Sequence, residues 1–409
     1  MSGFVEETTS IDDCLSLAAR SLGFPWNAKS RRVGVEDALY ARSAEDMIAP
    51  EPYPPFTRSL RDGYALNHAA SVGASASSPV FLSLAGEIYM GESPSFELAS
   101  GEAASIPTGG MLPRGADSVV MAENTSVSGG WVEIRSSVQR GLNVMTAAEE
   151  IARGDVLLRR GETISESTPG LLATFGITAV NVMDIRAGLI ATGDEIVPAG
   201  ASPLPTGFIR DANTFIIQSA LKRYGIESTS YGIAQDAWDA LKPASEAALR
   251  ECDVVLISGG SSVGAKDHAA RLIDCLSDRG LLARGLNMIP GKPTIIGGSR
   301  DAKKLIVGLP GHPLSCMAAT IFVALPLINA MYGTIGGVGK YCALPLSEDV
   351  SGHSGPDEFI PAKVGLDGVR PLAAKSGYVS AMRDADGFIR LRPDTETKRK
   401  GEMAEVWLW

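Results

Sequence analysis

Three glycine-rich segments of the chain are suited to binding a phosphate or another oxyanion. They are Thr192-Gly193-Asp194-Glu195, the run SGGSSVG from Ser258 to Gly264, and Gly308-Leu309-Pro310-Gly311-His312-Pro313. Glycine lets backbone N–H groups approach an anion, and a helix that begins just behind adds a favourable dipole. Each segment alone can be only a tight turn. The three together predict that they converge on one anion-binding cleft. SGGSSVG matches neither the Walker A sequence nor the GxGxxG fingerprint, so the usual nucleotide templates do not fit.

Carboxylates accompany these segments and point to a divalent cation. Asp194, Glu195, Asp211 and Asp267 all fall at or just after predicted strand ends. Mg²⁺ prefers carboxylate oxygens and retains several waters, so it can bridge such groups to a phosphate. Asp211 and Asp267 are equally suited to capping helices, whereas Glu195 caps nothing obvious. Glu195 is therefore the stronger candidate for a functional role.

Two further segments are candidates for contact with an anion. Pro290-Gly291-Lys292-Pro293 presents a lysine in a stiffened turn, and residues 54–65 (PPFTRSLRDGYA) combine two prolines, two arginines and an Asp-Gly turn. Solvated surface residues are the alternative in both places. The four histidines show no metal-ligand spacing, and only His312, in a Gly-x-Pro loop, is placed to touch a ligand.

The elements that would position these residues differ along the chain. Helical periodicity predicts two helices within the first 45 residues, one over 11–22 and one around 35–39. After a proline-rich break at 50–55, short β-like runs at 80–85, 118–122 and 131–134 predict a small β domain.

Buried strands alternate with helices between residues 186 and 308. Strands are predicted at 187–191, 253–257, 294–297 and 304–307, with Asp211 capping a helix that closes near Gly225 and Asp267 capping one that closes near Gly280. This order predicts a doubly wound parallel sheet, whose ligands bind at the carboxyl ends of the strands. Beyond Gly333, short strands predict a further β domain.

Composition limits the possible partners. The chain has 409 residues, 45% hydrophobic and 21% charged, with a net charge of −10, which disfavours nucleic acid as a partner. The start carries Glu6 and Glu7 and lacks a signal-peptide pattern, so we expect a cytoplasmic protein. The most apolar stretch, 317–332, is expected to be a buried helix and not a membrane span. The five cysteines lie far apart and are expected in the core of a protein in a reducing compartment.

An ordered set of motifs resembles one family closely. PPFTRSLRDGYA, SIPTGGMLPRGADSVVMAE, TGDEIVPAG, DAN, SGGSSVG, PGKP and GLPGHPLS follow one another in the order found in the molybdopterin molybdenumtransferases, the family of MoeA and the gephyrin E domain. The resemblance runs from about residue 10 to the C-terminus. It implies a multidomain α/β protein: an elongated stalk and dimerisation domain (1–30, 46–53 and 142–182), an inserted β domain (54–141), a molybdopterin-binding α/β domain (31–45 and 183–332) and a C-terminal β domain (333–409).

The same resemblance implies a reaction and an assembly. The reaction is insertion of molybdenum from molybdate into adenylylated molybdopterin, giving the molybdenum cofactor and AMP, with Mg²⁺ as cofactor. The assembly is a cytoplasmic homodimer, with the active site between the α/β domain of one subunit and the DGYA region of its partner. Molybdopterin adenylyltransferase and molybdoenzymes are the implied pathway partners, with no nucleic acid and no membrane.

The resemblance also assigns roles to residues. The implied catalytic residues are Asp62, Thr108, Glu150, Glu195, Asp211 and Asp267. The implied metal ligands are Glu195, Asp211 and Asp267. The implied substrate-binding residues are Arg58, Ser59, Arg61, Ser258, Gly259, Gly260, Ser262, Gly264, Lys292, Pro310, Gly311, His312, Ser315 and Ser376.

Several positions depart from the family pattern. Ile289 replaces a lysine before PGKP, His312 replaces an asparagine, Arg61 replaces a methionine, and Ala148-Glu149-Glu150 replaces Gly-Glu-Asp. The arginine-bearing motif expected near 355–359 is absent. We hypothesise that Arg61 compensates for the missing lysine. Two alternative functions stay open: the related adenylylation of molybdopterin, and a non-catalytic protein that binds or scaffolds molybdopterin.

Overall fold

The computed structural model describes residues 9–259, 263–334 and 340–409. It divides into two compact units. Unit 1 comprises Met1–Glu45, Leu158–Ala173 and Ile177–Trp409, and unit 2 comprises Asp46–Leu157 and Thr174–Gly176.

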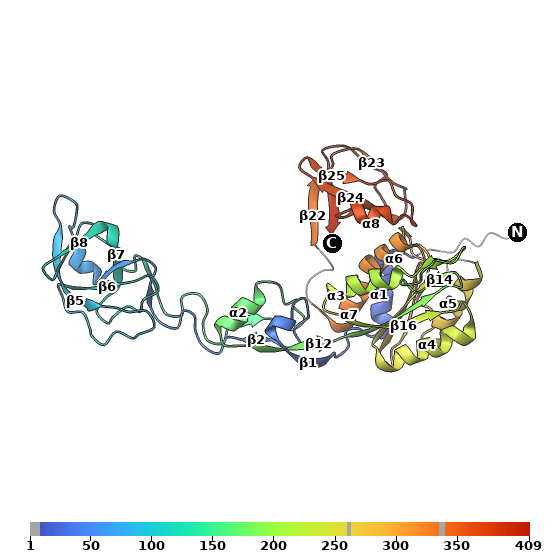
Figure 1. Cartoon of the computed structure of the whole chain (residues 1–409), viewed down its shortest axis with the longest axis horizontal. Helices are drawn as coiled ribbons and strands as arrows, with labels where there is room; N and C mark the ends of the chain where they lie inside the picture. Colours follow the sequence, from blue (N-terminus) through green and yellow to red (C-terminus); the bar gives the residue numbers. More distant parts are fainter. Residues whose placement is uncertain (1–8, 260–262, 335–339) are drawn as a thin grey trace. The chain divides into compact units, whose positions relative to one another are not determined.

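A six-stranded sheet forms the centre of unit 1 (Figure 1). Its strands, in spatial order, are β16 (Glu227–Ala234), β13 (Arg186–Thr192), β17 (Val254–Gly259), β21 (Lys304–Leu309), β20 (Ile295–Ser299) and β18 (Ala283–Arg284). The first four are parallel, β20 runs antiparallel to β21, and β18 runs antiparallel to β20. The predicted doubly wound sheet is confirmed, with antiparallel strands at one edge.

Helices cover both faces of this sheet because its central strands are apolar on both sides. Val254 and Leu256 of β17 belong to the core formed with α1 (Ile11–Leu22) and α3 (Asn213–Lys222). Val255 and Ile257 belong to the core formed with α4 (Trp238–Glu251) and α5 (Val263–Leu276). Successive side chains of a strand point to opposite faces, so a continuous apolar run is what a sheet buried on both faces requires.

The longest apolar helix is a core element of unit 1. It consists of α6 (Pro313–Ala319), a π-helical turn η4 (Thr320–Ala324) and α7 (Leu325–Tyr332). By length and composition the stretch Pro313–Tyr332 could cross a membrane, but 78% of its most apolar window is buried inside the protein. The predicted buried helix is confirmed.

The N-terminal segment contains one of the two predicted helices. α1 matches the prediction, and Ser10 caps it by accepting a hydrogen bond from the backbone N–H of Asp13. The second helix is wrong, because β1 (Lys29–Gly34) pairs antiparallel with β12 (Ala179–Asp184) and only a 3₁₀ turn, η1 (Val35–Asp37), follows. Long-range strand pairing overrides the local helical pattern here.

Two expectations about single residues of unit 1 are also wrong. α5 begins at Val263, so Asp267 lies within the helix and does not cap it. Asp211 does cap α3, since its Oδ1 accepts from the Thr214 N–H at 3.1 Å. Cys14, Cys252 and Cys316 are buried as expected, but Cys275 is exposed.

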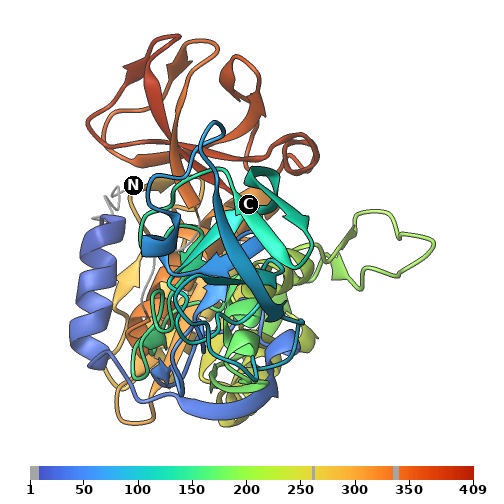
Figure 2. The same cartoon turned by 90° about the vertical axis from the view of Figure 1, so that its left-hand side faces the viewer.

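The C-terminal part of unit 1 is a second sheet, as predicted. Its strands are β19 (Met288–Ile289), β24 (Asp357–Gly365), β26 (Gly387–Leu391), β28 (Met403–Leu408) and β22 (Lys340–Pro345), with β25 (Gly368–Pro371) beside β24. The smaller elements of unit 1 are β14 (Ile196–Val197), β15 (Ile209–Arg210), β23 (Val350–Ser351), β27 (Thr397–Lys398), α2 (Thr168–Thr174) and α8 (Ser380–Asp384). The loop between β14 and β15 projects from the α/β body, as Figure 2 shows in light green.

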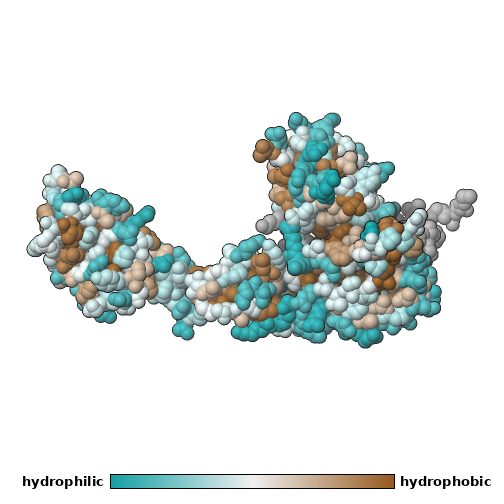
Figure 3. Space-filling model, in the orientation of Figure 1, coloured by the Kyte–Doolittle hydropathy of each residue, from teal (hydrophilic) through white to brown (hydrophobic). Residues whose placement is uncertain are grey.

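Unit 2 is a β domain, and the three strands predicted for it are confirmed. Its sheet has the order β7 (Ser118–Met121), β4 (Gly63–Leu66), β6 (Glu102–Ile106), β5 (Val80–Glu87), β9 (Trp131–Ile134) and β8 (Thr125–Ser128). β3 (Arg58–Ser59) pairs with β10 (Val144–Met145). The remaining elements are β2 (Met47–Ile48), β11 (Val156–Leu158), η2 (His68–Ser71) and η3 (Ala122–Asn124). The surface seen in Figure 3 carries hydrophobic residues in separate patches.

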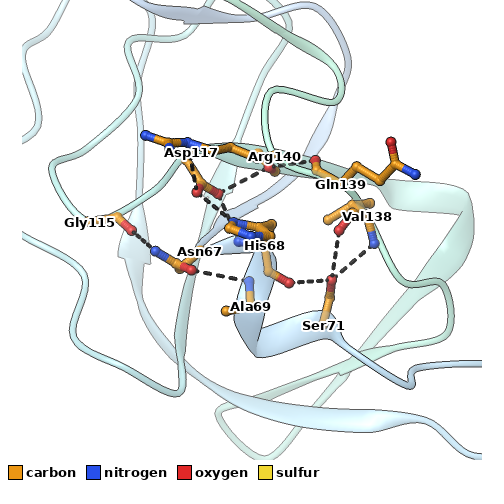
Figure 4. A network of polar contacts seen from close by, with 10 residues as sticks. Asn67, His68, Ala69, Ser71, Gly115, Asp117, Val138, Gln139 and Arg140 are labelled. Carbon is orange, nitrogen blue, oxygen red and sulfur yellow. Dashed lines mark hydrogen bonds and ion pairs between the residues drawn. The ribbon is translucent and has the colours of Figure 1, made fainter.

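A polar network fixes η2 to the sheet of unit 2 (Figure 4). Asp117 accepts from the His68 backbone N–H and contacts the His68 ring Nδ1, both at 2.7 Å. Ser71 accepts from the Val138 N–H at 3.0 Å. Burial alone would raise the pKa of Asp117, but the hydrogen bonds from His68 and Ser118 bring this pKa below its ordinary value. The network therefore stabilises the ionised carboxylate.

We predict that Asp117→Asn lowers the free energy of unfolding of unit 2 by about 1 kcal/mol at pH 7. Because the folded-state pKa lies below that of the unfolded chain, this contribution is present above about pH 4 and is lost as pH falls through the folded-state pKa. Urea unfolding at several pH values measures the difference, with the exposed Glu123→Gln of the same unit as the control. A difference that persists unchanged at pH 2 would contradict this account.

Candidate functional site

The carboxyl ends of three central strands lie in register at one edge of the sheet. Thr192 pairs with Gly259, and Ser258 pairs with Leu309. Gly259 has φ +133°, and a Cβ on it would lie 1.8 Å from the backbone oxygen of Thr192. Only glycine permits this close approach of the two strands. Gly259, the first glycine of SGGSSVG, is therefore required by the packing of the sheet, whether or not a ligand binds.

Carboxylates line the first cavity at this edge. It has a volume of about 990 Å³ and is lined by Asp194 after β13, Asp211 before α3 and Asp236 after β16. Among the described residues that line it there is no lysine or arginine. An anionic ligand therefore needs a cation between itself and these carboxylates.

Each of the three carboxylates is positioned by a hydrogen bond to its Oδ1. Asp236 accepts from the Thr192 hydroxyl at 2.7 Å, and Asp194 accepts from the Asp236 N–H at 3.1 Å. Asp211 is held by its cap to Thr214. No hydrogen bond between described residues uses Oδ2 of any of them, so these oxygens are available to a ligand.

Basic and hydroxyl side chains line a second cavity of about 570 Å³. It lies where the loop after β21 meets the turn before β20 and the C-terminal sheet. Its polar lining residues are Lys292, His312, Ser315, Ser351, His353, Glu358, Lys375 and Ser376. Glu358, the only carboxylate among its described lining residues, is held by the His353 N–H at 2.8 Å and contacts the His353 ring. This cavity suits an oxyanion.

One side chain joins the walls of the two cavities. Asn213, the first residue of α3, donates from Nδ2 to the backbone oxygen of Gly311 at 2.8 Å. Asn213 is 6% exposed, and its Oδ1 has no hydrogen-bond partner among the described residues. The loop after β21 is thereby fixed to the helix that carries Asp211 at its start.

The prediction of a single cleft is therefore wrong. The loop after β13 lines the acidic cavity, whereas Pro310, Gly311, His312 and Ser315 line the basic one with Lys292 and Ser376. Glu195 is exposed, and its Oε2 lies 2.9 Å from the position of a Cβ on Gly193, so the carboxylate folds back over that glycine. Ser258 is buried in β17. Gly260 and Ser262 lie outside the described residues. For Gly264 and Asp267, only the helical backbone is described.

Unit 2 brings two of its predicted site residues together. Asp62 Oδ1 accepts from the Thr108 N–H at 2.7 Å, and this hydrogen bond holds the pKa of Asp62 below its usual range. Ser59 is buried and donates its hydroxyl to the Arg61 backbone oxygen at 2.5 Å. Arg61 itself is exposed beside Asp62.

The remaining two predicted residues of unit 2 lie near Tyr53. The Arg58 guanidinium lies over the Tyr53 ring, 5.3 Å from its centroid, and donates to Met145 Sδ at 3.4 Å. Glu150 is exposed, and its backbone N–H donates to the backbone oxygen of Tyr53 at 3.1 Å. Ala148, where the family pattern has glycine, has φ +64°. The left-handed backbone explains why glycine is favoured at that position.

Sequence reasoning missed Asp236 and Lys375, which line the acidic and the basic cavity respectively. Asp236 follows β16, a strand with mostly exposed or half-exposed residues and no apolar run, so its position after a strand end was not recognised. Lys375 lies in an irregular segment of the C-terminal part, where no periodicity marks it. For Asp236 the available signal was an acidic residue soon after the end of a parallel strand.

Three family models match successive parts of the chain. The MoeA N-terminal region (domain I and II) matches residues 9–176, the family described as "Probable molybdopterin binding domain" matches 188–330, and the MoeA C-terminal region (domain IV) matches 343–409. A relative in Methanocaldococcus jannaschii, named "Putative molybdopterin biosynthesis protein", is 32% identical over 392 residues, which are 93% of each chain. The chain belongs to the MoeA family.

Other MoeA relatives agree with this assignment. The molybdopterin molybdenumtransferases of Staphylococcus epidermidis and Bacillus subtilis are each 29% identical, over 93% and 94% of this chain and 91% of each relative. A crystal structure of a MoeA protein from Pyrococcus horikoshii is 34% identical, covers 98% of this chain and 99% of its own, and has a TM-score of 0.77. The family and the multidomain α/β fold indicated by the motifs are confirmed.

The acidic cavity fits a magnesium ion in an open arrangement. Within the described residues, no three His, Cys, Asp or Glu side chains are close enough to enclose a metal. Mg²⁺ does not need such a cage, because it commonly uses one or two carboxylates together with waters and substrate phosphates. The available Oδ2 atoms of Asp194, Asp211 and Asp236 supply oxygen ligands of the required kind.

We predict that Gly259→Ala destabilises unit 1 by about 3 kcal/mol or more, because the new Cβ meets the backbone of Thr192. Gly232→Ala is the matched control. Gly232 also has positive φ, at +87°, but a Cβ there meets nothing within 4 Å. Its expected cost is about 1 kcal/mol. Thermal unfolding compares the two, and equal stability of both variants would contradict the steric argument.

Proposed function

We propose that the chain is a molybdopterin molybdenumtransferase, which inserts molybdenum from molybdate into adenylylated molybdopterin and releases AMP. The observation that carries the proposal is the presence of two adjoining cavities of opposite charge at one sheet edge. The reaction needs both, because a phosphoanhydride with Mg²⁺ and a free oxyanion must be bound at the same time. The names of the relatives in Staphylococcus epidermidis and Bacillus subtilis support the same reaction.

The acidic cavity is proposed to receive the phosphoanhydride end of adenylylated molybdopterin. One or two of Asp194, Asp211 and Asp236 would hold Mg²⁺ together with waters and the substrate phosphates. Glu195 and Asp267 are the other acidic residues predicted from the sequence. When bound, Mg²⁺ neutralises charge on the phosphate oxygens and on the departing AMP. The carboxylates, held by their Oδ1 hydrogen bonds, would position the ion and, through it, the substrate phosphates.

The basic cavity is proposed to receive molybdate. Lys292 and Lys375 neutralise its charge, Ser315 offers a hydroxyl group, and Ser376 lines the same wall beside His312. Asn213 keeps the two sites at a fixed spacing through Gly311. Positioning and electrostatic stabilisation then supply most of the rate enhancement, as is usual for reactions at phosphoryl groups.

Unit 2 is proposed to complete the site in a cytoplasmic homodimer. Asp62 and Thr108, which are joined by a hydrogen bond, and the exposed Arg61 and Glu150 are the groups it offers. We propose that they meet the α/β domain of the partner subunit. Molybdopterin adenylyltransferase would supply the substrate, and molybdoenzymes would receive the product.

Incubation of the purified protein with adenylylated molybdopterin and Mg²⁺, with and without micromolar molybdate, tests the proposal. The expected result is AMP release that depends on molybdate, with molybdenum bound to the pterin. Tight pterin binding without AMP release would favour a molybdopterin-binding or scaffold protein. Consumption of ATP with unadenylylated molybdopterin would favour the adenylylation reaction.

We predict that Asp236→Asn raises the Mg²⁺ concentration for half-maximal AMP release by about tenfold or more, because one anionic ligand is lost. Asp239→Asn is the control, since Asp239 lies only three residues further on, is exposed and does not line the cavity. Titration of AMP release with Mg²⁺ measures both variants. An unchanged Mg²⁺ requirement in Asp236→Asn would contradict the assignment of this cavity.

A further inference from the structure

His312 occupies the residue position that begins the long core helix. It is the N-cap of α6, with extended backbone, and its oxygen accepts from the Cys316 N–H at 2.8 Å. Residues such as asparagine are favoured at an N-cap because their side chain accepts a hydrogen bond from the first helical turn. The His312 side chain makes no such bond. Its ring is used for something else.

The ring is oriented by Ser376 of the C-terminal part of unit 1. Ser376 Oγ lies 2.9 Å from His312 Nδ1. The backbone oxygen of Ser376 also accepts from the Leu314 N–H at 3.1 Å, so the segment that carries Ser376 is fixed to the start of the helix twice. The Cδ2 edge of the ring lies 3.8 Å from the position of a Cβ on Gly377. No described residue forms a hydrogen bond with Nε2.

An oxyanion bound in the basic cavity would require one particular tautomer of the ring. His312 lines the basic cavity with Lys292 and Lys375, and the cavity's one described carboxylate, Glu358, is engaged by His353. To donate to an oxyanion bound in the cavity, the ring needs its proton on Nε2, the nitrogen that no described residue engages. The Ser376 hydroxyl then donates to Nδ1, which leaves the proton on Nε2.

We propose that His312 is a direct ligand of the oxyanion substrate, with Nε2–H as the donor and Ser376 as the residue that sets the orientation and tautomer of the ring. The inference rests on the proposed function for the identity of the oxyanion. It gives Ser376 a positioning role and assigns the contact with molybdate to His312. His312 thus supplies a hydrogen-bond donor to the basic cavity. Ile289 lines the same cavity at a position where the family pattern has a lysine.

Two amide substitutions separate this role from a purely structural one. In His312→Asn the amide nitrogen takes the place of Nδ1, so the contact with Ser376 is retained and the donor to the cavity is lost. In His312→Gln the amide nitrogen takes the place of Nε2, so the donor is retained and the contact with Ser376 is lost. Equilibrium dialysis with inorganic molybdate at constant pH measures the dissociation constant of each full-length variant.

We expect His312→Asn to weaken molybdate binding about tenfold, as for loss of a hydrogen bond to a charged ligand, and His312→Gln to weaken it by about threefold or less. Ser376→Ala should fall between the wild type and His312→Asn. His268→Asn, a histidine that lines neither cavity, is the control. If His312→Gln binds molybdate more weakly than His312→Asn, then His312 only holds the segment of Ser376 against the start of α6, and the proposal is overturned. A wild-type protein that binds no molybdate at millimolar concentration would also overturn it.

Failure of this inference and failure of the proposed function give different results. If wild-type protein releases AMP in response to molybdate and His312→Asn keeps the same molybdate dependence, the function stands and the role of His312 is wrong. If molybdate binds and His312→Asn weakens it, but no AMP is released from adenylylated molybdopterin, His312 is an oxyanion ligand in a protein with another function.

Discussion

The rest of the site depends on one electrostatic constraint. No described lysine or arginine lines the cavity that contains Asp194, Asp211 and Asp236. Three carboxylates around one cavity repel any phosphate unless a divalent cation lies between them. The basic cavity carries the opposite charge, so it attracts a free oxyanion without a metal. Two ligands that are both anionic can therefore be held close together, because each is neutralised by different means.

The fold maintains this separation of charge through short backbone contacts. Gly259 allows β13 and β17 to run side by side to their carboxyl ends, where Thr192 holds Asp236. Asn213 ties the start of α3 to the loop after β21, between the acidic and the basic residues. Because these links are made by buried or half-buried groups on rigid elements, the spacing of the two cavities is fixed before any substrate binds.

Much of this arrangement could be predicted from the sequence. The apolar runs at 187–191, 253–257 and 304–307 identified the strands, and their order gave the parallel sheet and the edge where ligands bind. Lys292 and His312 were recognised from their turns. Local patterns could not reveal that residues 35–39 follow a strand paired with 179–184, because that pairing is formed across about 150 residues of chain.

Contacts between segments that lie far apart in the chain were the hardest to predict from the sequence. Asp236 was missed because β16 is half exposed and lacks an apolar run. The division into two cavities depends on the packing of the C-terminal sheet, which brings Lys375 and Ser376 to the loop after β21. No spacing within a single segment carries that information. The sequence correctly placed the ends of β13, β17 and β21 at one edge of the sheet. Tertiary packing decides which cavity each following loop lines.

The most direct test of two independent, oppositely charged sites is equilibrium binding of AMP and molybdate to the same protein, measured separately and together, with and without Mg²⁺. The account predicts that AMP binds only with Mg²⁺, that molybdate binds without it, and that saturating one ligand leaves room for the other. Mutual exclusion of AMP and molybdate, or binding of AMP that needs no divalent cation, would contradict it.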